Sequence, residues 1–556
     1  MLMKQRIAQL VAQAVEEAQR QGNLPAGPIP AIEVEHPQNA EHGDFATSLP
    51  LRLARAARMN PMSIAERLAP LIPNDATFQR IWAAPPGFIN FAVTRQWLQQ
   101  QVEAIIGDGD SYGTIQPDTP QRIQVEFVSV NPTGPIHVGH ARGAVLGSGL
   151  ASILEAAGHT VSREYYINDA GSQMNAFYRS LYVRYRQALG QEAQMPENGY
   201  MGSYMEDLAR VLVAEEGARF LHMPEPEAVA AIGAIGLRKM LASIRQDLAR
   251  IGVEFDVWFS ERTLFESGEY TTAMDLLRQK GYLSERDNAT WFTSTALGED
   301  KDNVLVRTTG EPTYFASDIA YHHNKFIQRG FDQVIDIWGA DHQGHVSRVK
   351  AAVGALGVDP SRLTILISQL VTLKRGEEVV RISKRTGDLI TLRELMDEVG
   401  SDACRFFFLS RSPDSQMDFD LELAKQQSDA NPVYYVQYAH ARIAGIMRLA
   451  RERRLDYARG DVALLTHEAE EGLIRKMLLL PEMVEQIADS LEPHHLPVYA
   501  LELATAFHWF YQQCRVVSSE PADEAVTLAR LKLVEGCRIV LARCLALMGM
   551  SAPERM

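Results

Sequence analysis

The chain has 556 residues, of which 46% are hydrophobic and 22% charged, as in an ordinary globular protein with about three or four domains. The formal charge of −15 at pH 7 excludes nucleic-acid binding through a bulk positive field, but it leaves room for a local basic surface. The four cysteines lack C-x-x-C spacing, which favours small buried side chains in a reducing compartment over zinc or disulfides.

The first 115 residues are expected to form a small α+β module. The chain opens with an amphipathic helix that lacks the continuous apolar core of a signal peptide, so we expect a cytoplasmic protein. Residues 29–36 and 85–93 have strand character and flank a helical stretch that breaks at Asn60-Pro61. A linker with several Gly, Asp and Pro residues, 107–120, follows this module.

Residues 125–157 predict a strand, a tight turn and a helix. The β-branched and aromatic run at 124–130 suits a buried strand. Asn131, Pro132, Gly134 and Pro135 punctuate the turn. Apolar and small residues then recur at helical spacing from 138 to 157, and Gly158 ends the helix.

Two histidines mark the start of this predicted helix. His137 and His140 are three residues apart and share a helix face, while Gly139 lets a flat group approach the backbone. A helix N-terminus offers free N–H groups and a positive dipole end, which together suit a phosphate. We therefore interpret the turn as a nucleotide-phosphate site, the alternative being a pair of solvated or helix-capping histidines.

The middle of the chain alternates between strand and helix patterns. A strand at 159–167 would complete a right-handed β-α-β unit, with Asn168, Asp169 and Gly171 at its carboxyl end, where parallel sheets bind ligands. From 172 to about 286 the periodicity is helical, and we interpret this stretch as an insertion that splits a nucleotide-binding fold. Strand character returns at 289–298 and 303–322, with a hairpin turn in TTGEP, and in the buried run 331–345.

Two basic features follow. Arg381, Ser383, Lys384 and Arg385 lie in a loop between a strand and a helix, where they form either a phosphate clamp or a solvated turn. From about residue 416 the pattern is helical to the end, and residues 442–459 contain six arginines against two acidic residues. This run is either a solvated helix face or a surface for the RNA backbone.

Together these motifs resemble those of class I aminoacyl-tRNA synthetases. His137-Val-Gly-His140 occupies the place of the His-Ile-Gly-His signature. Arg381-Ile-Ser-Lys384-Arg385 occupies the place of Lys-Met-Ser-Lys-Ser, with Arg381 in place of the first lysine and Ile382 in place of the methionine. The similarity is closest to bacterial arginyl-tRNA synthetases, whose hallmarks are present as EFVSVNPTGPIHVGHARGAVLG, YINDAG, PTYFASDIAYH, IWGADHQGH, SKRTGD, PVYYVQYAHARI and MGMSAPERM.

The resemblance implies an α/β protein of three domains. These are an N-terminal α+β tRNA-binding domain at 1–115, a Rossmann-like parallel-sheet catalytic domain at 116–415 with the helical insertion at about 172–286, and an all-helical anticodon-binding domain at 416–556. It also implies arginine–tRNA ligase activity, in which L-arginine and ATP give arginyl-adenylate and the arginyl group passes to the tRNA. We expect ATP with Mg²⁺ as substrate, no tightly bound metal or prosthetic group, no membrane contact and a monomer.

The resemblance also assigns roles to individual residues. The catalytic group is His137, His140 and Lys384, which can act on the phosphate chain and the leaving pyrophosphate, and the signature turn comprises Pro132, Thr133, Gly134, Pro135, Ile136, His137, Val138, Gly139, His140, Ala141 and Arg142. Predicted ATP-binding residues are Gly139, Gly339, Asp341, His342 and Ser383. Predicted arginine-binding residues are Glu126, Tyr314 and Asp318 at the guanidinium and Asn131 at the α-amino group, and predicted tRNA-binding residues are Phe45, Arg442, Arg448 and Arg451.

Three alternatives stay open at this point. Tyr314 and Asp318 are four residues apart and would also suit a surface i, i+4 pair on a helix beginning at about Thr313. A small nucleotidyltransferase also uses an H-x-G-H turn, although the chain length and the helical C-terminal part argue against it. A synthetase-like RNA-binding protein without catalysis is disfavoured because His137, His140 and Lys384 are all present.

Overall fold

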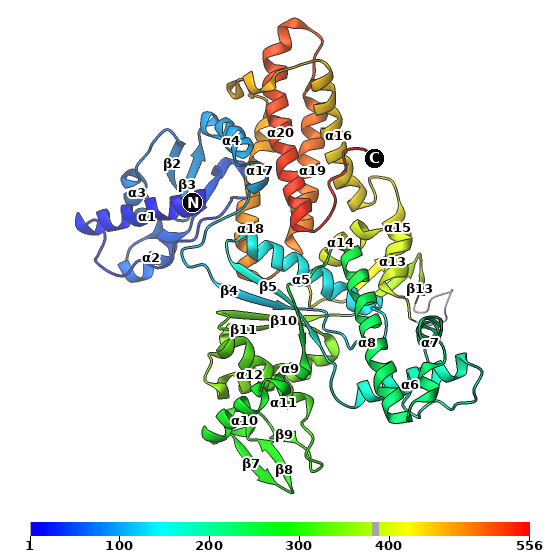
Figure 1. Cartoon of the computed structure of the whole chain (residues 1–556). Coiled ribbons are helices and arrows are strands. Elements are labelled where there is room, and N and C mark those ends of the chain that lie inside the picture. The colour runs from blue at the N-terminus through cyan, green and yellow to red at the C-terminus, as the bar shows by residue number, and fades with distance from the viewer. Residues whose placement is uncertain (1, 381–388) are drawn as a thin grey trace.

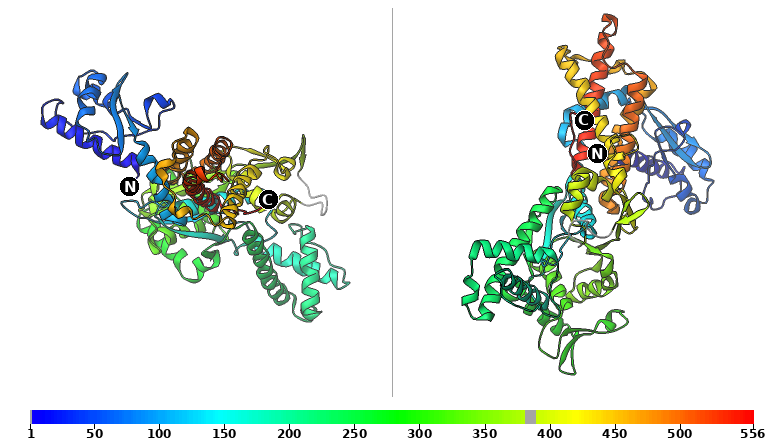
Figure 2. Two further views of the ribbon diagram at one scale, coloured as in Figure 1. Left: turned by 90° about the horizontal axis from the view of Figure 1, so that it is seen from above. Right: turned by 90° about the vertical axis from the view of Figure 1, so that its right-hand side faces the viewer.

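The computed structural model describes residues 2–380 and 389–556 (Figure 1). Figure 1 shows a central sheet with a bundle of C-terminal helices above it and a small separate sheet at the far lower end. Figure 2 shows two parts that project from opposite sides of this body: the N-terminal module, and the helices between residues 172 and 250. Arg381, Ser383, Lys384 and Arg385 lie outside the described residues.

A five-stranded parallel sheet forms the centre of the molecule. Its strands lie in the order β11-β10-β4-β5-β6, with neighbours paired in parallel. The bounds are β4 Arg122–Glu126, β5 Thr160–Ile167, β6 Val257–Ser260, β10 Gln333–Gly339 and β11 Leu363–Ser368. Because β5 and β6 extend from one side of β4 and β10 and β11 from the other, a topological switch point lies between β4 and β10. The ends of these two strands are therefore the expected ligand site.

Helix α5, Val138–Ala156, packs on this sheet and confirms the predicted helix to within a residue. Of its 19 residues, 14 are buried, which explains why its sequence is apolar and small on every side. A Cβ on Gly147 would lie 2.2 Å from the Phe127 ring, so only glycine allows the helix to approach the end of β4 this closely. The predicted strand at 124–130 is shorter than expected, because Val128 and Ser129 adopt positive φ angles of 69° and 41°.

The N-terminal module contains a three-stranded antiparallel sheet ordered β1-β3-β2 and four helices. Its elements are α1 Met3–Arg20, β1 Phe45–Thr47, α2 Leu49–Ala57, α3 Pro61–Leu68, β2 Phe78–Ala84, β3 Phe88–Val93 and α4 Arg95–Asp108. The predicted strand at 29–36 is wrong: this segment forms only a single bridge, between Glu35 and Ala46. Pro28 and Pro30 have no N–H to donate to a ladder, which fits this outcome.

Three long helices follow β5 in the sequence. They are α6 Ser172–Ala188, α7 Ser203–Glu216 and α8 Glu225–Arg250. The prediction of a helical stretch from 172 to about 286 is correct for these helices but not for the residues after them. The expectation of continuous helix to about 286 is wrong beyond α8, since β6 and β7, Leu283–Arg286, both lie in that stretch. Four-residue strands are too short to alter a periodicity dominated by the helices around them.

The second half of the catalytic region adds helices and two small sheets. Its helices are α9 Glu261–Glu266, α10 Glu269–Gln279, α11 Tyr314–His323, α12 Val346–Leu356, α13 Leu392–Val399, α14 Ser401–Leu409 and α15 Leu421–Lys425. Its strands are β7, β8 Ala289–Phe292, β9 Asn303–Val306, β12 Val371–Arg375, β13 Glu378–Val380 and β14 Met417–Asp420. A bridge between Val306 and Pro312 closes the predicted TTGEP hairpin turn. The strand predicted at 303–322 is wrong beyond this turn, since β9 ends at Val306 and α11 begins at Tyr314, where Phe315 and Ile319 are buried at helical i, i+4 spacing.

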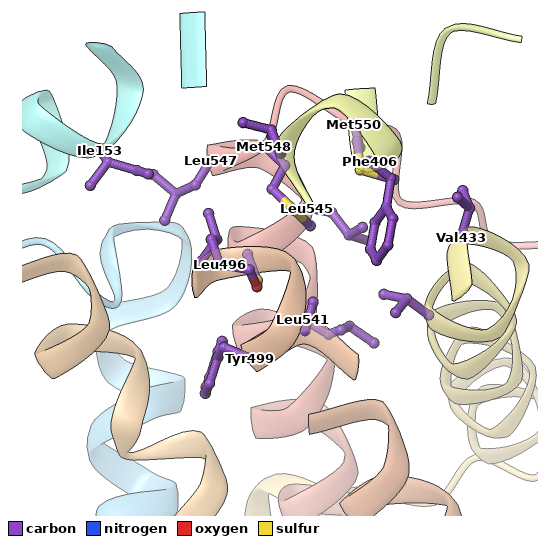
Figure 3. Packing of buried hydrophobic residues seen from close by; sticks show 14 of the residues in the cluster. Ile153, Phe406, Val433, Leu496, Tyr499, Leu541, Leu545, Leu547, Met548 and Met550 are labelled. Atoms are coloured by element: carbon purple, nitrogen blue, oxygen red, sulfur yellow. The ribbon is translucent and has the colours of Figure 1, made fainter. Parts of the chain in front are cut away.

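The C-terminal part is helical, with α16 Pro432–Glu452, α17 Glu468–Met477, α18 Leu479–Ser490, α19 His495–Gln513 and α20 Glu524–Leu547. Its apolar core is continuous with that of the parallel sheet, as Figure 3 shows for Ile153 of α5, Phe406 of α14 and Leu541 of α20. Within the described residues, no helix combines the length and apolar character that a membrane span requires.

Candidate active site

The predicted phosphate site lies at the N-terminus of α5. His137 is the N-cap residue, and the His137 and His140 ring centroids are 3.8 Å apart, so both side chains lie at one point of the helix start. Two backbone hydrogen bonds hold the turn: Val138 N donates to Ile390 O (3.1 Å), and Leu392 N donates to Ile136 O (2.8 Å). These bonds join the His137–His140 signature to residues 390–392, which follow the second signature in the sequence.

Burial determines the charge of both histidines. It lowers the pKa of His137, and it lowers the pKa of His140 to about 4, where His137 adds to the effect and Asp341 opposes it. Nδ1 of His140 is buried and has no hydrogen-bond partner among the described residues. At neutral pH the pair is therefore uncharged, and each ring has one N–H to donate to a phosphate oxygen.

The predicted adenosine site follows the end of β10, the strand next to β4. A Cβ on Gly339 would lie 2.7 Å from Oδ1 of the exposed Asp341 side chain, so a larger residue here would displace that carboxylate. Asp341 and His342 are exposed, with Oδ2 and Nε2 3.6 Å apart. Since the Asp341 charge acts on the pKa of His140, the two strand ends bring these predicted residues into one region. Ser383 and Lys384 lie outside the described residues.

The predicted arginine-binding residues surround the end of β4. Tyr314 is the first residue of α11, as expected, and is 46% exposed, while Asp318 lies one turn further on. Burial raises the pKa of Asp318 to about 6, and the charge of Glu126 contributes to this rise. Glu126 is buried, and Asn131 Nδ2 donates to Gln173 Oε1 (2.6 Å). The i, i+4 pair Tyr314–Asp318 thus lies beside a buried carboxylate and not on an isolated surface.

Two further side chains, Tyr166 and Glu261, lie among these predicted arginine-binding residues, and sequence reasoning missed both. Burial raises the pKa of Glu261, which lies close enough to Tyr166, Tyr314 and Asp318 for its charge to raise the pKa of all three. Its Oε2 atom is buried and accepts no hydrogen bond from any residue that the structure describes. Tyr166 belongs to the YINDAG motif and could have been found, whereas Glu261 fell inside the stretch interpreted as helical insertion.

Arg142 ends the signature turn but does not reach the phosphate region. The residue is completely buried, and its guanidinium donates to four backbone carbonyls, those of Gln369 (3.2 Å), Ser415 (2.7 Å), Arg411 (3.3 Å) and Ser412 (2.6 Å). Arginine's fork of donors suits this arrangement. The side chain thus fixes α5 to the loop before β14 and to the turn between β11 and β12.

The predicted tRNA-binding residues differ in exposure. Arg442 lies over the rings of Tyr438 (4.6 Å) and Tyr511 (5.0 Å), Arg448 Nη1 donates to Glu554 O (3.1 Å), and Arg451 is exposed. Phe45, by contrast, is only 6% exposed and packs in the core of the N-terminal module, which argues against a surface contact through its side chain.

Comparison with known proteins matches each part of the chain to a family. Residues 101–408 match the catalytic domain of class I tRNA synthetases (R), and residues 436–556 match the DALR anticodon-binding domain. The fold and the site therefore define a class I aminoacyl-tRNA synthetase, and the predicted fold class is confirmed.

The particular family follows from the remaining matches. Residues 5–93 match the arginyl-tRNA synthetase N-terminal domain, and the chain is 58% identical over 554 residues to the arginine–tRNA ligase of Dehalococcoides mccartyi, covering 100% of this chain and 99% of that one. It is 50% identical over 556 residues to that of Carboxydothermus hydrogenoformans, covering 99% of each. The chain belongs to the arginyl-tRNA synthetases, and its activity is that of an arginine–tRNA ligase, an ATP-using enzyme.

Solved structures support the fold. The Thermus thermophilus arginyl-tRNA synthetase matches with a TM-score of 0.77 at 22% identity, covering 100% of both chains. The Plasmodium falciparum arginyl-tRNA synthetase matches with a TM-score of 0.74 at 16% identity, covering 100% of this chain and 99% of that one.

Proposed function

We propose that residues at the carboxyl ends of β4 and β10 carry out arginine activation with Mg-ATP as the substrate. The arginine carboxylate attacks the α-phosphate in line, a bond to the α-phosphorus forms, and the bond to the β,γ-diphosphate breaks. The arginyl group of the adenylate then passes to the terminal ribose of the tRNA, and AMP leaves. The observation that supports this assignment is the proximity of the His137–His140 pair to Asp341 at the switch point of the sheet.

The phosphate chain is bound by His137, His140 and the N-terminus of α5. Neutral imidazoles act here as hydrogen-bond donors, and the helix end adds free N–H groups and a positive dipole. Charge on the leaving pyrophosphate requires a cation, a role we assign to Lys384, which lies outside the described residues. The chemistry is thus positioning and charge stabilisation, with no covalent enzyme intermediate.

Binding of the two small substrates is divided between the strand ends. We assign the adenosine of ATP to Gly139, Gly339, Asp341, His342 and Ser383. We assign the arginine guanidinium to Glu126, Tyr314 and Asp318 and the α-amino group to Asn131. Since lysine or an uncharged analogue would leave buried acceptors without donors, discrimination is expected to be large without a proofreading site.

The tRNA is assigned to the two outer domains. Arg442, Arg448 and Arg451 of the C-terminal helices are proposed to contact the RNA backbone near the anticodon. They belong to the proposed anticodon-binding domain at 416–556, of which residues 436–556 match the DALR family. The N-terminal domain at 1–115 is proposed to bind another part of the tRNA, and the catalytic domain spans 116–415. We further propose that the enzyme is a cytoplasmic monomer without a tightly bound metal.

The test is ATP–pyrophosphate exchange across a panel of amino acids, with and without the cognate tRNA. Exchange with arginine alone, and only when tRNA is present, is the expected result, because we propose that tRNA completes the site. Exchange with another amino acid, or none under any condition, would contradict the assigned site.

A further inference from the structure

A buried lysine lies beneath the proposed arginine pocket. Lys325 has no exposed surface and belongs to a π-helical turn, Asn324–Gln328, that continues α11. Its Nζ donates to Glu126 Oε2 (2.5 Å) and to Asp336 Oδ1 (2.8 Å). Isolated π-helical turns are rare and occur frequently at functional sites. This turn places a cation between the parallel strands β4 and β10.

The contacts of Glu126 leave its carboxylate partly free. Oε2 accepts from Lys325, and Oε1 accepts from Ser129 Oγ (2.9 Å). A carboxylate offers about four acceptor positions, so two remain once the bonds among the described residues are counted. Ser129 in turn adopts a strained φ of 41° and accepts from Tyr166 N (3.1 Å), which fixes the hydroxyl that supports Glu126.

Lys325 is also linked to the second proposed guanidinium ligand. Asp336 Oδ2 lies 3.1 Å from His322 Nε2, and His322 Nδ1 lies 2.7 Å from the backbone oxygen of Asp318. The lysine therefore connects both carboxylate-bearing segments of the pocket through one buried network.

Glu126 has an unfavourable environment for a negative charge. Burial raises its pKa, Asp336 and Glu164 raise it further, and Lys325 opposes the rise. Asp336 and Glu126 raise the pKa of Lys325 against the effect of its own burial, so the lysine is cationic at neutral pH. The titratable groups around Glu126 are Lys325 on the π-helical turn, Asp336 on β10, Glu164 and Tyr166 on β5, and Asp318, Tyr321 and His322 on α11.

We propose that Lys325 is a positioning residue for arginine recognition, which holds Glu126 ionised and oriented so that two acceptor positions of its carboxylate are left for the substrate guanidinium. The proposal rests on the assigned role of Glu126 in binding arginine. Lys325 itself, with no exposed surface, does not touch the substrate.

The test is the KM for arginine in aminoacylation as a function of pH, in the full-length enzyme. Lys325→Met removes the cation but keeps much of the side-chain volume, and we expect it to raise this KM by on the order of tenfold near pH 7, with little change in the KM for ATP. Without Lys325 the pKa of Glu126 rises further, so Glu126 becomes protonated at a higher pH. As the pH is lowered, the KM for arginine should therefore begin to increase at a higher pH in this variant than in the wild type. Lys325→Arg should restore both, while the matched control Lys239→Met, which removes a partly exposed lysine paired with Glu215, should change neither.

Two further variants separate the possible failures. Glu126→Gln should raise the KM for arginine, and if it does not, the assigned role of Glu126 fails, whatever Lys325 does. If Glu126→Gln raises the KM and Lys325→Met changes neither the KM nor its pH dependence, the positioning role is overturned. Lys325→Met combined with Asp336→Asn removes one charge of each sign and protects against misfolding. A raised arginine KM in this double variant is expected, because Glu126 still lacks the Lys325 donor that orients it. A normal KM would show that Glu126 is correctly oriented without Lys325 and would overturn the proposal.

Discussion

Arg142 is predicted to determine the stability of the catalytic domain, although it belongs to the signature turn. Arg142→Met removes four hydrogen bonds and leaves the carbonyls of Gln369, Arg411, Ser412 and Ser415 without this donor. At about 1 kcal/mol for each bond, the loss is about 4 kcal/mol. Methionine avoids the desolvation of a buried cation, which recovers part of that loss, so we expect a net destabilisation of about 3 kcal/mol.

Thermal unfolding followed by circular dichroism measures this effect. For a domain of this size, 1 kcal/mol corresponds to about 2–4 °C, so the apparent Tm should fall by roughly 6–12 °C. Arg142→Lys should also destabilise, because an ammonium group cannot reproduce the planar fork. Arg210→Met, which removes an exposed arginine paired with Asp207, is the matched control and should shift the Tm by less than about 2 °C. An Arg142→Met variant with the Tm of this control would refute the reasoning.

Three further predictions concern the reaction. His140→Asn should lower the rate of tRNA-dependent ATP–pyrophosphate exchange by about 10²–10³-fold, as for the loss of one transition-state donor, and a loss below about threefold would contradict its assignment. Because the pKa of Asp318 is raised to about 6, its carboxyl group becomes neutral as the pH falls through that value, so the KM for arginine should increase there. Asp318→Asn should raise this KM at all pH values and remove the part of the pH dependence that belongs to Asp318, leaving only the part due to Glu126. A flat wild-type profile would contradict the assigned role. Arg451→Met should raise the KM for tRNA severalfold and weaken the salt dependence of this KM, without altering the KM for ATP, as measured by aminoacylation at increasing salt. The control Arg278→Met, which removes an exposed arginine outside the C-terminal helices, should leave the KM for tRNA and its salt dependence unchanged.

The parts of the site that could be predicted from sequence are those encoded locally. The strand, turn and helix around His137 follow from residue types and spacing within some thirty residues, and the structure places the helix N-terminus at this histidine. The spacing of Tyr314 and Asp318 likewise suits one face of a helix beginning at about Thr313, as α11 does, although the general pattern favours a strand over 303–322. Local chemistry was therefore sufficient for the histidine pair and for the Tyr314–Asp318 spacing.

The parts that could not be predicted depend on contacts between distant segments. Glu126, Lys325 and Asp336 meet because β4 pairs with β10 in the sheet, and no periodicity encodes that pairing. Strand β6 was missed because its four residues follow three long helices, and Glu261, the residue after it, was missed with it. The strained backbone at Val128 and Ser129 likewise has no signal in the residue types, since valine disfavours positive φ.

Burial links the fold of this site to its chemistry. The same packing that buries 14 residues of α5 also desolvates His140 and lowers its pKa to about 4. An uncharged imidazole can donate a hydrogen bond to a phosphate oxygen without adding positive charge. The proposed role of the histidine pair is therefore to position the nucleotide, which leaves charge neutralisation to cations. On the arginine side the same burial raises the pKa of Glu126 and Asp318, and an internal cation, Lys325, is available only to the first of these through a direct ion pair. Asp318 has no such ion-pair partner among the described residues, so the substrate guanidinium that we propose it binds would be its first direct cationic partner.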